Sequence, residues 1–397
     1  MINGRYSARR FTSLLLLAAV AVGACAPART AAPSAVTATT ASTSAPGAAA
    51  SGAVTTTASK AALAPVYPQG DWQRIQNPEG LGWASDGLER VRTRLSSMHT
   101  SGFMAVVGGR VLMDYGDLDT LSYLASVRKS VLAMLYGNYV RSGRIDLNET
   151  LEQLGIDDVE GLTPGEKQAT VRDALTARTG IYHPASNGGD DTRFAPARGS
   201  QKPGSYYLYN NWDFNVLGTI FEQKTGLDIY DAIEKDLARP LGFQDWNRSI
   251  QRKSGNARVS KHLAYHINLS TRDMARLGYL MLREGRWNDT QVIPRDWVHE
   301  MVQPFTRRTE MNPEPRRSGE FGYGYLWWVF DNPELPAIYE GAYTGLGAVG
   351  QQILVMPKLD LVVVHKTVPG EGRSVSHPQF LEVVKLLLEA HCGERCE

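Results

Sequence analysis

The chain contains little cysteine and carries almost no net charge. Its 397 residues include three cysteines, Cys25, Cys392 and Cys396, which are too few for the disulfide framework that holds many small exported domains together. Packing must therefore stabilise the core, although Cys392 and Cys396 can form a short disulfide near the C-terminal end. With 42 Lys and Arg against 41 Asp and Glu and no basic stripe, the composition predicts no nucleic-acid partner.

Signatures of metal and cofactor chemistry are also missing. His262 and His266 lie four residues apart, but no glutamate follows the first, which excludes the metalloprotease helix. The segment Gly345 to Gly350 matches the dinucleotide pattern Gly-x-Gly-x-x-Gly, yet a strand-like run follows it where that fingerprint needs a helix. We therefore predict no metal site and no cofactor. The chain also lacks the Gly-x-Ser-x-Gly elbow that often accompanies a Ser-His-Asp triad.

The first 25 residues have the features of an export signal. Arginines precede the apolar run Leu14 to Val22, which is too short to span a bilayer but typical of a signal-peptide core. The run ends in a sequence that resembles a bacterial lipoprotein cleavage box. We predict a signal over residues 1–25, with Cys25 as the lipidated N-terminus of an exported bacterial lipoprotein on the periplasmic or extracellular side. Plain secretion with cleavage near Ala26 is the alternative.

Residues 26–64 differ in composition from everything that follows. They are almost entirely Ala, Thr, Ser, Pro, Gly and Val, with Arg29 and Lys60 as the charged exceptions. Such a segment cannot bury enough apolar surface to fold, so it is predicted to be a disordered linker. Residues 65–397 are sufficient for one large core with a second lobe. We expect this domain to be monomeric and to meet a membrane only through the N-terminal lipid.

The order of the expected elements indicates an α+β fold. Helical spacing is expected from Ser85 to Met98, from Ser126 to about Gly143, and over 170–178, 212–225, 228–238, 270–284, 294–303 and 378–390. Strand patterns are expected over 103–107, 111–115, 322–330, 338–344, 351–356 and 361–366. Strands at both ends with helices between them imply one antiparallel sheet flanked by helices, with a mostly helical lobe inserted into it.

The segment Ala125 to Ser130 carries the strongest indication of chemistry. Ser126 and Lys129 are three residues apart at the start of an expected helix, so their side chains share one face and can touch, while Arg128 points elsewhere. A serine becomes a nucleophile when a neighbouring base takes its proton. Free lysine titrates at about 10.4, so Lys129 needs burial or a nearby positive charge to serve as that base. Alone, the pair could equally be a helix start with a surface lysine.

Two further motifs strengthen this interpretation. Tyr209-Asn210-Asn211 opens an expected helix, and Tyr343-Thr344-Gly345 lies in a late strand. Ser-x-x-Lys, then Tyr-x-Asn, then Thr-Gly on a late strand resembles the serine β-lactamase and penicillin-binding protein family, and within it the class C branch with its esterase and peptidase relatives. The resemblance extends over roughly Leu81 to His391.

The resemblance implies a β-lactamase-like fold and assigns roles to residues of this chain. Ser126 would be the nucleophile, with Lys129 and Tyr209 as general base and acid, and Asn211 would orient Lys129 and the substrate amide. Backbone amides of Ser126 and Leu346 would hold the oxyanion, and Tyr343, Thr344 and Gly345 would line the substrate site.

The third motif departs from the family pattern in a way that bears on the substrate. Relatives carry Lys or His before Thr-Gly, where a cation holds a substrate carboxylate, and this chain carries Tyr343. We therefore expect a serine hydrolase for a small ester or amide. The alternatives are a class C β-lactamase or a D-Ala-D-Ala peptidase acting on a peptide, a penicillin-binding sensor without turnover, and a catalytically dead surface protein.

Two other segments have open interpretations. Residues Pro184 to Gly204 form a long Gly-, Pro- and Asp-rich stretch, which is either a lid over the substrate pocket or a mobile surface loop. Its Asp190 and Asp191 either meet a cationic substrate or lie at a solvated loop tip. The aromatic run around Trp327 and Trp328 either lines a pocket or divides between pocket and core, because strand residues alternate in direction.

Overall fold

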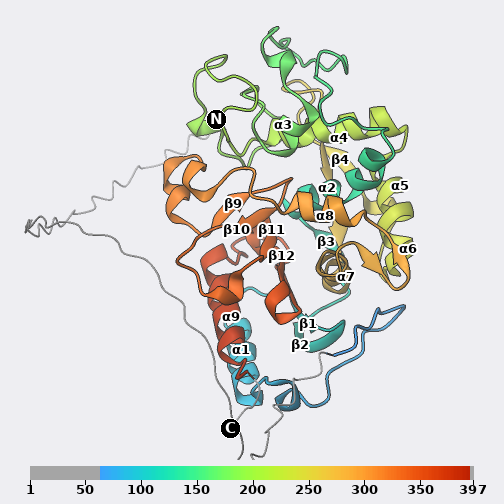
Figure 1. Cartoon of the computed structure of the whole chain (residues 1–397), viewed down its shortest axis with the longest axis vertical. Helices are drawn as coiled ribbons and strands as arrows, with labels where there is room; N and C mark the ends of the chain where they lie inside the picture. The colour runs from blue at the N-terminus through green and yellow to red at the C-terminus, as the bar shows by residue number, and fades with distance from the viewer. Residues whose placement is uncertain (1–62, 394–397) are drawn as a thin grey trace, which may run out of the picture. The chain divides into compact units, whose positions relative to one another are not determined.

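The computed structural model describes residues 63–393, so the predicted signal segment and nearly all of the predicted linker lie outside the described residues. Seven strands of the described part form one antiparallel sheet in the order β2-β1-β13-β12-β11-β10-β9 (Figure 1). Strand β1 pairs directly with β13, from Gly102 opposite Lys366 to Val107 opposite Leu361. Segments from both ends of the domain thus build one sheet, which confirms the predicted architecture. The sheet strands are β1 Gly102–Val107, β2 Arg110–Gly116, β9 Phe321–Tyr323, β10 Trp328–Phe330, β11 Tyr343–Gly347, β12 Gln351–Met356 and β13 Leu361–Lys366.

The helices and the remaining strands lie mostly between β2 and β9 in sequence. The helices are α1 Ser85–Ser96, α2 Val127–Arg141, α3 Val171–Leu175, α4 Asn211–Thr225, α5 Ile229–Ile233, α6 Arg239–Leu241, α7 Thr271–Leu282, α8 Arg295–Met301 and α9 His377–Glu389. Three short strand pairs accompany them: β3 Ser122–Tyr123 with β6 Asn268–Leu269, β4 Arg252–Ser254 with β5 Ala264–His266, and β7 Arg286–Trp287 with β8 Thr290–Gln291.

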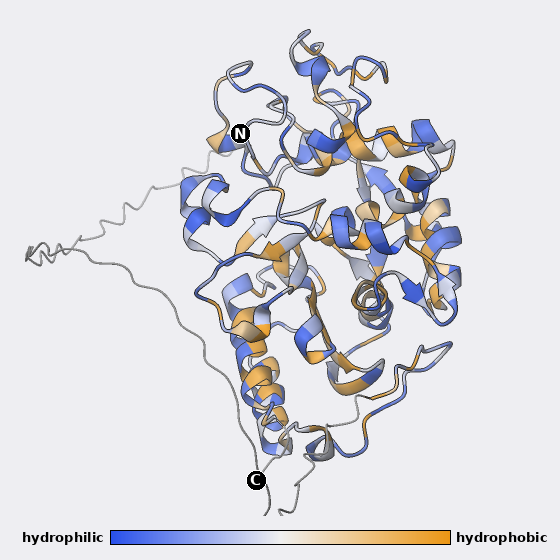
Figure 2. Ribbon diagram, in the orientation of Figure 1, coloured by the Kyte–Doolittle hydropathy of each residue, from blue (hydrophilic) through white to orange (hydrophobic). Residues whose placement is uncertain are grey.

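Both faces of the central sheet are covered, which explains why its central strands are apolar at nearly every position. In β1, Phe103 and Ala105 pack in a cluster with α1 and α9, whereas Met104 and Val106 belong to a cluster with α2 and α7. Successive strand residues point to opposite faces, so a strand covered on both sides needs apolar side chains throughout. Helices α1 and α9 lie side by side (Figure 1), and hydrophobic residues gather along this pair and the sheet (Figure 2).

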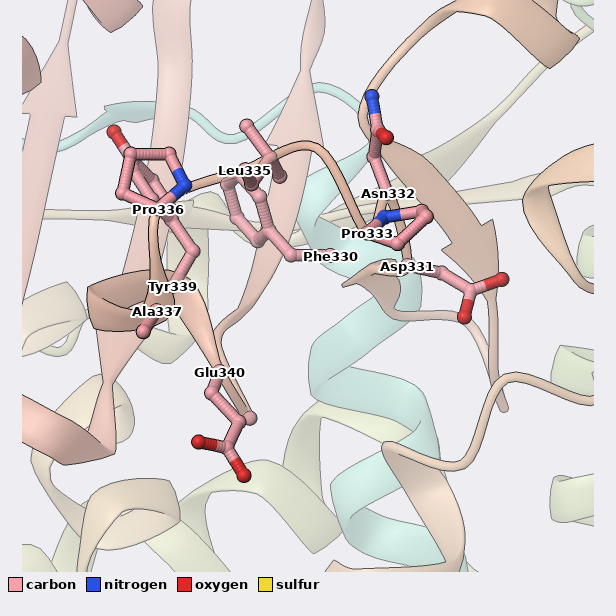
Figure 3. A pocket seen from close by; sticks show the side chains of 10 residues that line it. Phe330, Asp331, Asn332, Pro333, Leu335, Pro336, Ala337, Tyr339 and Glu340 are labelled. Carbon is pink, nitrogen blue, oxygen red and sulfur yellow. The ribbon is translucent and has the colours of Figure 1, made fainter.

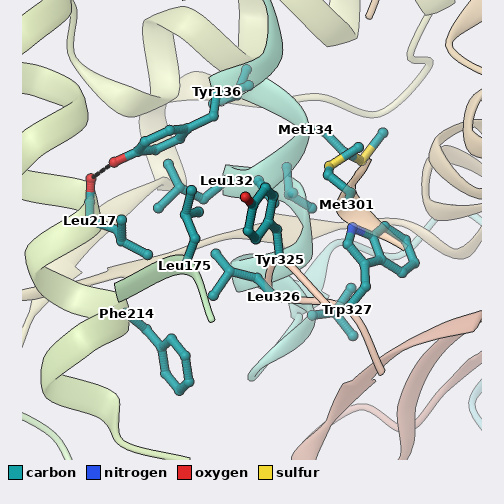
Figure 4. Close-up of a cluster of buried hydrophobic side chains, with 14 of the residues drawn as sticks. Leu132, Met134, Tyr136, Leu175, Phe214, Leu217, Met301, Tyr325, Leu326 and Trp327 are labelled. Carbon is teal, nitrogen blue, oxygen red and sulfur yellow. Dashed lines mark hydrogen bonds between the residues drawn. The ribbon is translucent and has the colours of Figure 1, made fainter. Parts of the chain in front are cut away.

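Helix α2 is buried around nearly its whole circumference, including the polar residues of its first turn. Its Leu132, Met134 and Tyr136 lie in a cluster with Leu175 of α3 and Leu217 of α4 (Figure 4). The Tyr136 hydroxyl donates a hydrogen bond to the Leu217 carbonyl at 2.7 Å. The N-terminus of α2 is therefore fixed by packing along the whole helix.

Several predicted boundaries were wrong, and local backbone geometry explains two of them. The expected helix 170–178 ends at Leu175, because Ala177 adopts a φ of 56° that a right-handed helix excludes. The expected strand 322–330 is broken into β9 and β10 by a turn at Leu326, where φ is 59°.

Other boundaries differ without a change in the order of elements. The expected strand 338–344 begins only at Tyr343, after a 3₁₀ turn at Ala337–Tyr339. The expected helix 228–238 is α5, which continues through a π-helical turn at Glu234–Ala238 into α6.

The described residues also bear on the predicted membrane contact and on the predicted disulfide. Within 63–393 no helix is both long and apolar enough to cross a membrane. Cys392 is disulfide-bonded, whereas Cys396 and Cys25 lie outside the described residues.

Candidate active site

Ser126 lies at the N-terminus of α2, directly after a sharp turn. Ala125 has a φ of 49°, in the left-handed region that residues with a Cβ rarely adopt, and the Val127 N–H donates to the Leu124 carbonyl at 3.2 Å. Strained backbone of this kind is concentrated at functional sites. The half-buried Ser126 therefore lies at the positive dipole end of a long buried helix.

Lys129 is almost completely buried and contacts both of the other predicted catalytic residues. Its exposed fraction is 1%, and its Nζ lies 3.1 Å from Ser126 Oγ and 2.6 Å from the Tyr209 hydroxyl. The amine also lies 4.1 Å from the ring centroid of Tyr209 and 4.3 Å from that of Phe214. In the described part of the chain, no carboxylate forms an ion pair with it. The structure thus joins Ser126, Lys129 and Tyr209 in one hydrogen-bonded group.

The surroundings of Lys129 favour its uncharged form. Burial, followed by the positive charge of Arg128, lowers the pKa of Lys129 well below its usual value, and the charges of Asp190 and Asp191 oppose this shift only in part. Desolvation disfavours the charged form of any group, and a nearby like charge adds to the penalty. An uncharged amine beside a hydroxyl is able to accept its proton.

Tyr209 is held by packing and stays protonated. It lies just before α4, where the Asn210 side chain caps the helix by accepting from the Trp212 N–H at 2.9 Å. Its ring centroid is 4.8 Å from that of Phe214 and 5.4 Å from that of Trp328. Burial raises the pKa of the Tyr209 phenol to about 12, while the Ser126 hydroxyl and the Arg128 charge lower it in part. At neutral pH the phenol is therefore a proton donor.

Asn211 does not take the place that the sequence predicts for it. In the described residues no hydrogen bond joins its side chain to Lys129. Its Nδ2 donates instead to the Gly188 carbonyl at 2.8 Å, and its backbone N–H donates to Asp190 Oδ2 at 3.0 Å. Its Oδ1 is buried and has no hydrogen-bond partner among the described residues.

The loop 184–204 is held against the second motif by these contacts. Asp191 is largely buried and pairs with Arg316 at 2.6 Å, and the Arg316 guanidinium carbon lies 5.2 Å from the ring centroid of Trp328. The interpretation of Asp191 as part of a solvated loop tip was therefore wrong. Arg316 could not be predicted as a site residue, because it belongs to none of the three motifs.

The third motif lies on β11, close to the start of α2. A Cβ at Gly345 would lie 3.1 Å from Ser130 Oγ, so this side chain would have to shift by a few tenths of an ångström. Thr344 is buried and pairs across the sheet with Trp328 of β10. It therefore lies beside the cluster of aromatic rings that packs on Tyr209. Leu346 is half-buried and follows them on the same strand.

Of the two interpretations of the aromatic run around Trp327 and Trp328, the structure supports the one in which its residues divide between the core and the site. Trp328 packs on Tyr209, whereas Trp327 is fully buried and makes an edge contact with Tyr343 at 5.5 Å. Tyr343 therefore has its ring in the core. The position that carries a cation in relatives is occupied here by a buried, neutral phenol, whose pKa burial raises far above its usual value.

A separate pocket lies away from this group. It has a volume of about 440 Å³ and is lined by residues from Phe330 to Gly341, in the connection between β10 and β11 (Figure 3). It shares no residue with the group of Ser126, Lys129 and Tyr209, and its carboxylates Asp331 and Glu340 are paired with Arg307 and Lys358. The candidate site is therefore identified by the chemistry of its side chains and not by the position of this pocket. Within the described residues, no group of three His, Cys, Asp or Glu is arranged to hold a metal ion.

Solved structures share this fold. A protein of Bacillus anthracis that is described as a 6-aminohexanoate-dimer hydrolase matches with a TM-score of 0.59 and 18% identity, over 81% of this chain and 87% of that one. A class C β-lactamase variant matches with a TM-score of 0.58 and 15% identity, over 80% of this chain and 99% of that one. At these identities the likeness concerns the fold.

Comparison of the amino-acid sequence with known proteins shows to which family the chain belongs. The 6-aminohexanoate-dimer hydrolase of Paenarthrobacter ureafaciens is 25% identical over 307 residues, which are 70% of this chain and 74% of that protein. The family described as Beta-lactamase matches residues 89–367, a range that contains Ser126, Lys129, Tyr209 and the third motif. The chain therefore belongs to the beta-lactamase family.

Proposed function

We propose that the protein is a serine hydrolase that forms an acyl-enzyme on Ser126 and acts on a small, uncharged ester or amide. The observation that carries this proposal is the position of the Lys129 amine, 3.1 Å from Ser126 Oγ and 2.6 Å from the Tyr209 hydroxyl. A buried amine without a carboxylate partner is suited to take a proton, which is what a serine nucleophile requires.

Acylation follows from the protonation states of the three groups. Lys129 takes the Ser126 proton while Oγ forms a bond to the substrate carbonyl carbon. The charge that develops on the carbonyl oxygen is held by the backbone N–H of Ser126 and, by resemblance to the family, that of Leu346. As the bond to the leaving group breaks, the proton passes from Lys129 through the Tyr209 hydroxyl to the leaving oxygen or nitrogen.

Deacylation uses the same groups in the reverse direction. A water molecule gives its proton through Tyr209 to Lys129 while its oxygen attacks the acyl carbon. The bond from that carbon to Ser126 Oγ then breaks, and Oγ takes the proton back. The product acid leaves and the three groups return to their starting states.

The electrostatics of the site support an uncharged substrate. The third motif supplies the neutral Tyr343 in place of a cation, and Arg316, the cation that does lie near Trp328, is paired with Asp191. A substrate carboxylate would thus find no unpaired cation at either position. The relative from Paenarthrobacter ureafaciens hydrolyses the 6-aminohexanoate dimer, and this supports a small-molecule substrate.

Covalent labelling tests the nucleophile. A fluorophosphonate probe should label the protein on Ser126, and Ser126→Ala should abolish the label. A label of equal yield on another serine would contradict the assignment. Nitrocefin, short p-nitrophenyl esters and amino-acid amides, assayed side by side, then define the substrate class. Turnover of an ester or amide well above that of nitrocefin supports the proposal, and a burst without turnover on any of them indicates a penicillin-binding sensor.

We further propose that the enzyme is exported and anchored through a lipid on Cys25, and that it is a monomer. The sequence of residues 1–25 supports this, and residues 26–64 would serve as a tether. Cys25→Ser should abolish incorporation of a labelled fatty acid and leave the signal uncleaved; incorporation that persists would contradict the anchor. Gel filtration with light scattering tests the monomer, since one family relative of known structure is octameric.

A further inference from the structure

Arg128 is a fully buried cation without an anionic partner. Its exposed fraction is 1%, and in the described part of the chain it forms no ion pair. Its Nη2 donates to Asn215 Oδ1 at 3.0 Å, its Cζ lies 4.3 Å from the ring centroid of Tyr265, and its Nη1 has no hydrogen-bond partner. A buried charge without a counter-ion is costly, and a cation in the first turn of a helix also opposes the helix dipole.

The contrast with Arg276 shows that this arrangement is specific to Arg128. Arg276 on α7 is equally buried, but it pairs with Asp273 at 3.2 Å and donates to the Gly70 carbonyl and to Gln244 Oε1. The fold thus supplies a carboxylate where a buried guanidinium has a structural role. It supplies none at Arg128, which is adjacent to the predicted catalytic base.

We propose that Arg128 is a positioning residue that keeps the adjacent Lys129 amine uncharged, so that Lys129 can take the proton of Ser126. This inference rests on the proposed function. Consecutive residues of a helix diverge by about 100°, so Arg128 acts from the side of Lys129 that is turned away from Ser126. It reaches no reacting atom and leaves the space around Ser126 free.

The physical basis is repulsion in a medium of low dielectric. Both side chains are almost fully buried, and charges repel far more strongly there than in water. A guanidinium does not lose its proton in proteins, so the repulsion is relieved only when Lys129 gives up its own. Asn215 and the Tyr265 ring hold the guanidinium by dipole and cation–π contacts, which leave its positive charge uncompensated.

The other groups around Lys129 do not cancel this charge. Ser126 and Tyr209 are neutral. Asp190 already accepts from the Asn211 N–H and from the Thr192 hydroxyl, and Asp191 is paired with Arg316.

The charge of Arg128 also acts on residues from other elements. His266 of β5 has its pKa lowered to about 4 by burial, then by Arg128 and Arg252. The positive field of Arg128 therefore extends beyond its own helix.

The test is the pH dependence of Ser126 acylation in the full chain, measured as the second-order rate of fluorophosphonate labelling. Loss of the positive charge in Arg128→Gln should move the acidic limb of the profile to higher pH by about one to two units. Arg128→Lys introduces an amine that, unlike a guanidinium, can lose its own proton when it is buried, so it should move the limb in the same direction but by less than Arg128→Gln. Arg276→Gln removes an equally buried guanidinium away from the site and serves as the matched control.

The position of the limb is the decisive readout, because a smaller amount of folded enzyme lowers the whole profile without moving it. A limb in Arg128→Gln that coincides with wild type overturns the proposal, and so does an equal displacement in Arg276→Gln. If Ser126→Ala is still labelled, the proposed function itself fails. If the label is confined to Ser126 and the limb does not move, the role of Arg128 alone is refuted.

Discussion

The Lys129 amine lies 2.6 Å from the Tyr209 hydroxyl, and burial moves the pKa values of the two groups in opposite directions. It lowers the pKa of the amine and raises that of the phenol, because desolvation disfavours whichever form carries charge. The result is a neutral base in contact with a neutral acid. Such a pair can take a proton from Ser126 and deliver it to a leaving group.

Tyr209→Phe should lower kcat/KM for a short ester or amide by about 10²- to 10⁴-fold, the usual contribution of general acid–base catalysis. The variant keeps the ring that packs on Phe214 and Trp328 and loses only the hydroxyl that relays the proton. Steady-state kinetics and a thermal melt measure both effects. Unchanged activity at an unchanged Tm would rule out the relay. Tyr207→Phe, which alters another buried phenol, is the control and should keep most of the activity.

Gly347→Ala should impair acylation because it displaces the turn before Ser126. An added Cβ at position 347 would lie 2.6 Å from the Leu124 carbonyl oxygen, so backbone must move. We expect kcat/KM to fall by about 10²-fold, as for other misplacements near 1 Å, with a loss of about 1–3 kcal/mol in stability. Gly165→Ala, where a Cβ meets nothing within 4 Å, should change neither quantity. Equal activity of the two variants would show that β11 does not define the site.

Asp191→Asn should make the enzyme more tolerant of substrates that carry a carboxylate. The change frees Arg316, which now pairs with Asp191 at 2.6 Å beside Trp328. We expect the ratio of kcat/KM for nitrocefin to that for p-nitrophenyl acetate to rise by about three- to tenfold, the effect of one partly exposed charge contact. The control is Asp114→Asn, which breaks the pair with Arg74 away from the site. A ratio that stays constant in both variants would mean that Asp191 does not control the charge of the pocket.

Lys366 should make the protein more stable as the pH rises above neutrality. Its Nζ donates to the carbonyls of Thr120, Ser122 and Leu269, and burial lowers its pKa to about 7. An unfolded lysine titrates at about 10.4. Between these values the unfolded chain therefore binds one more proton, and the free energy of unfolding rises by about 1.4 kcal/mol per pH unit from this residue.

Urea unfolding at several values between about pH 7 and pH 9 measures this linkage. The slope for Lys366→Met should be smaller than the wild-type slope by that amount, and Lys358→Met, which removes an exposed lysine, is the control. Identical slopes in all three proteins would contradict the assignment.

The sequence was sufficient for the architecture and for the centre of the site. Apolar strand patterns define the strands on either side of the helical region, and the i, i+3 spacing of Ser126 and Lys129 places both on one face of α2. Tyr209 was found through the order of three motifs, although its contact with Lys129 joins residues 80 positions apart.

The remaining features depend on tertiary contacts that no local pattern carries. Asn211 was expected to reach Lys129, but the loop 184–204 returns against α4 and occupies its side chain. The pairing of Asp191 with Arg316 spans 125 positions, and the absence of an anionic partner for Arg128 within residues 63–393 is a property of its neighbours in space. The predicted boundaries of helices and strands were wrong where single residues, such as Leu326, adopt a positive φ, because the residue type does not indicate such a conformation.

The central claim is that a neutral Lys129 allows Ser126 to become acylated, and rapid quenching during turnover tests it most directly. The enzyme is mixed with a short acyl ester, quenched in acid within the first turnovers, digested and analysed by mass spectrometry. The account predicts the acyl mass on the peptide that contains Ser126, and its loss in Lys129→Arg, whose permanent charge cannot accept a proton. Acylation of another residue, or undiminished acylation of Ser126 in Lys129→Arg, would contradict it.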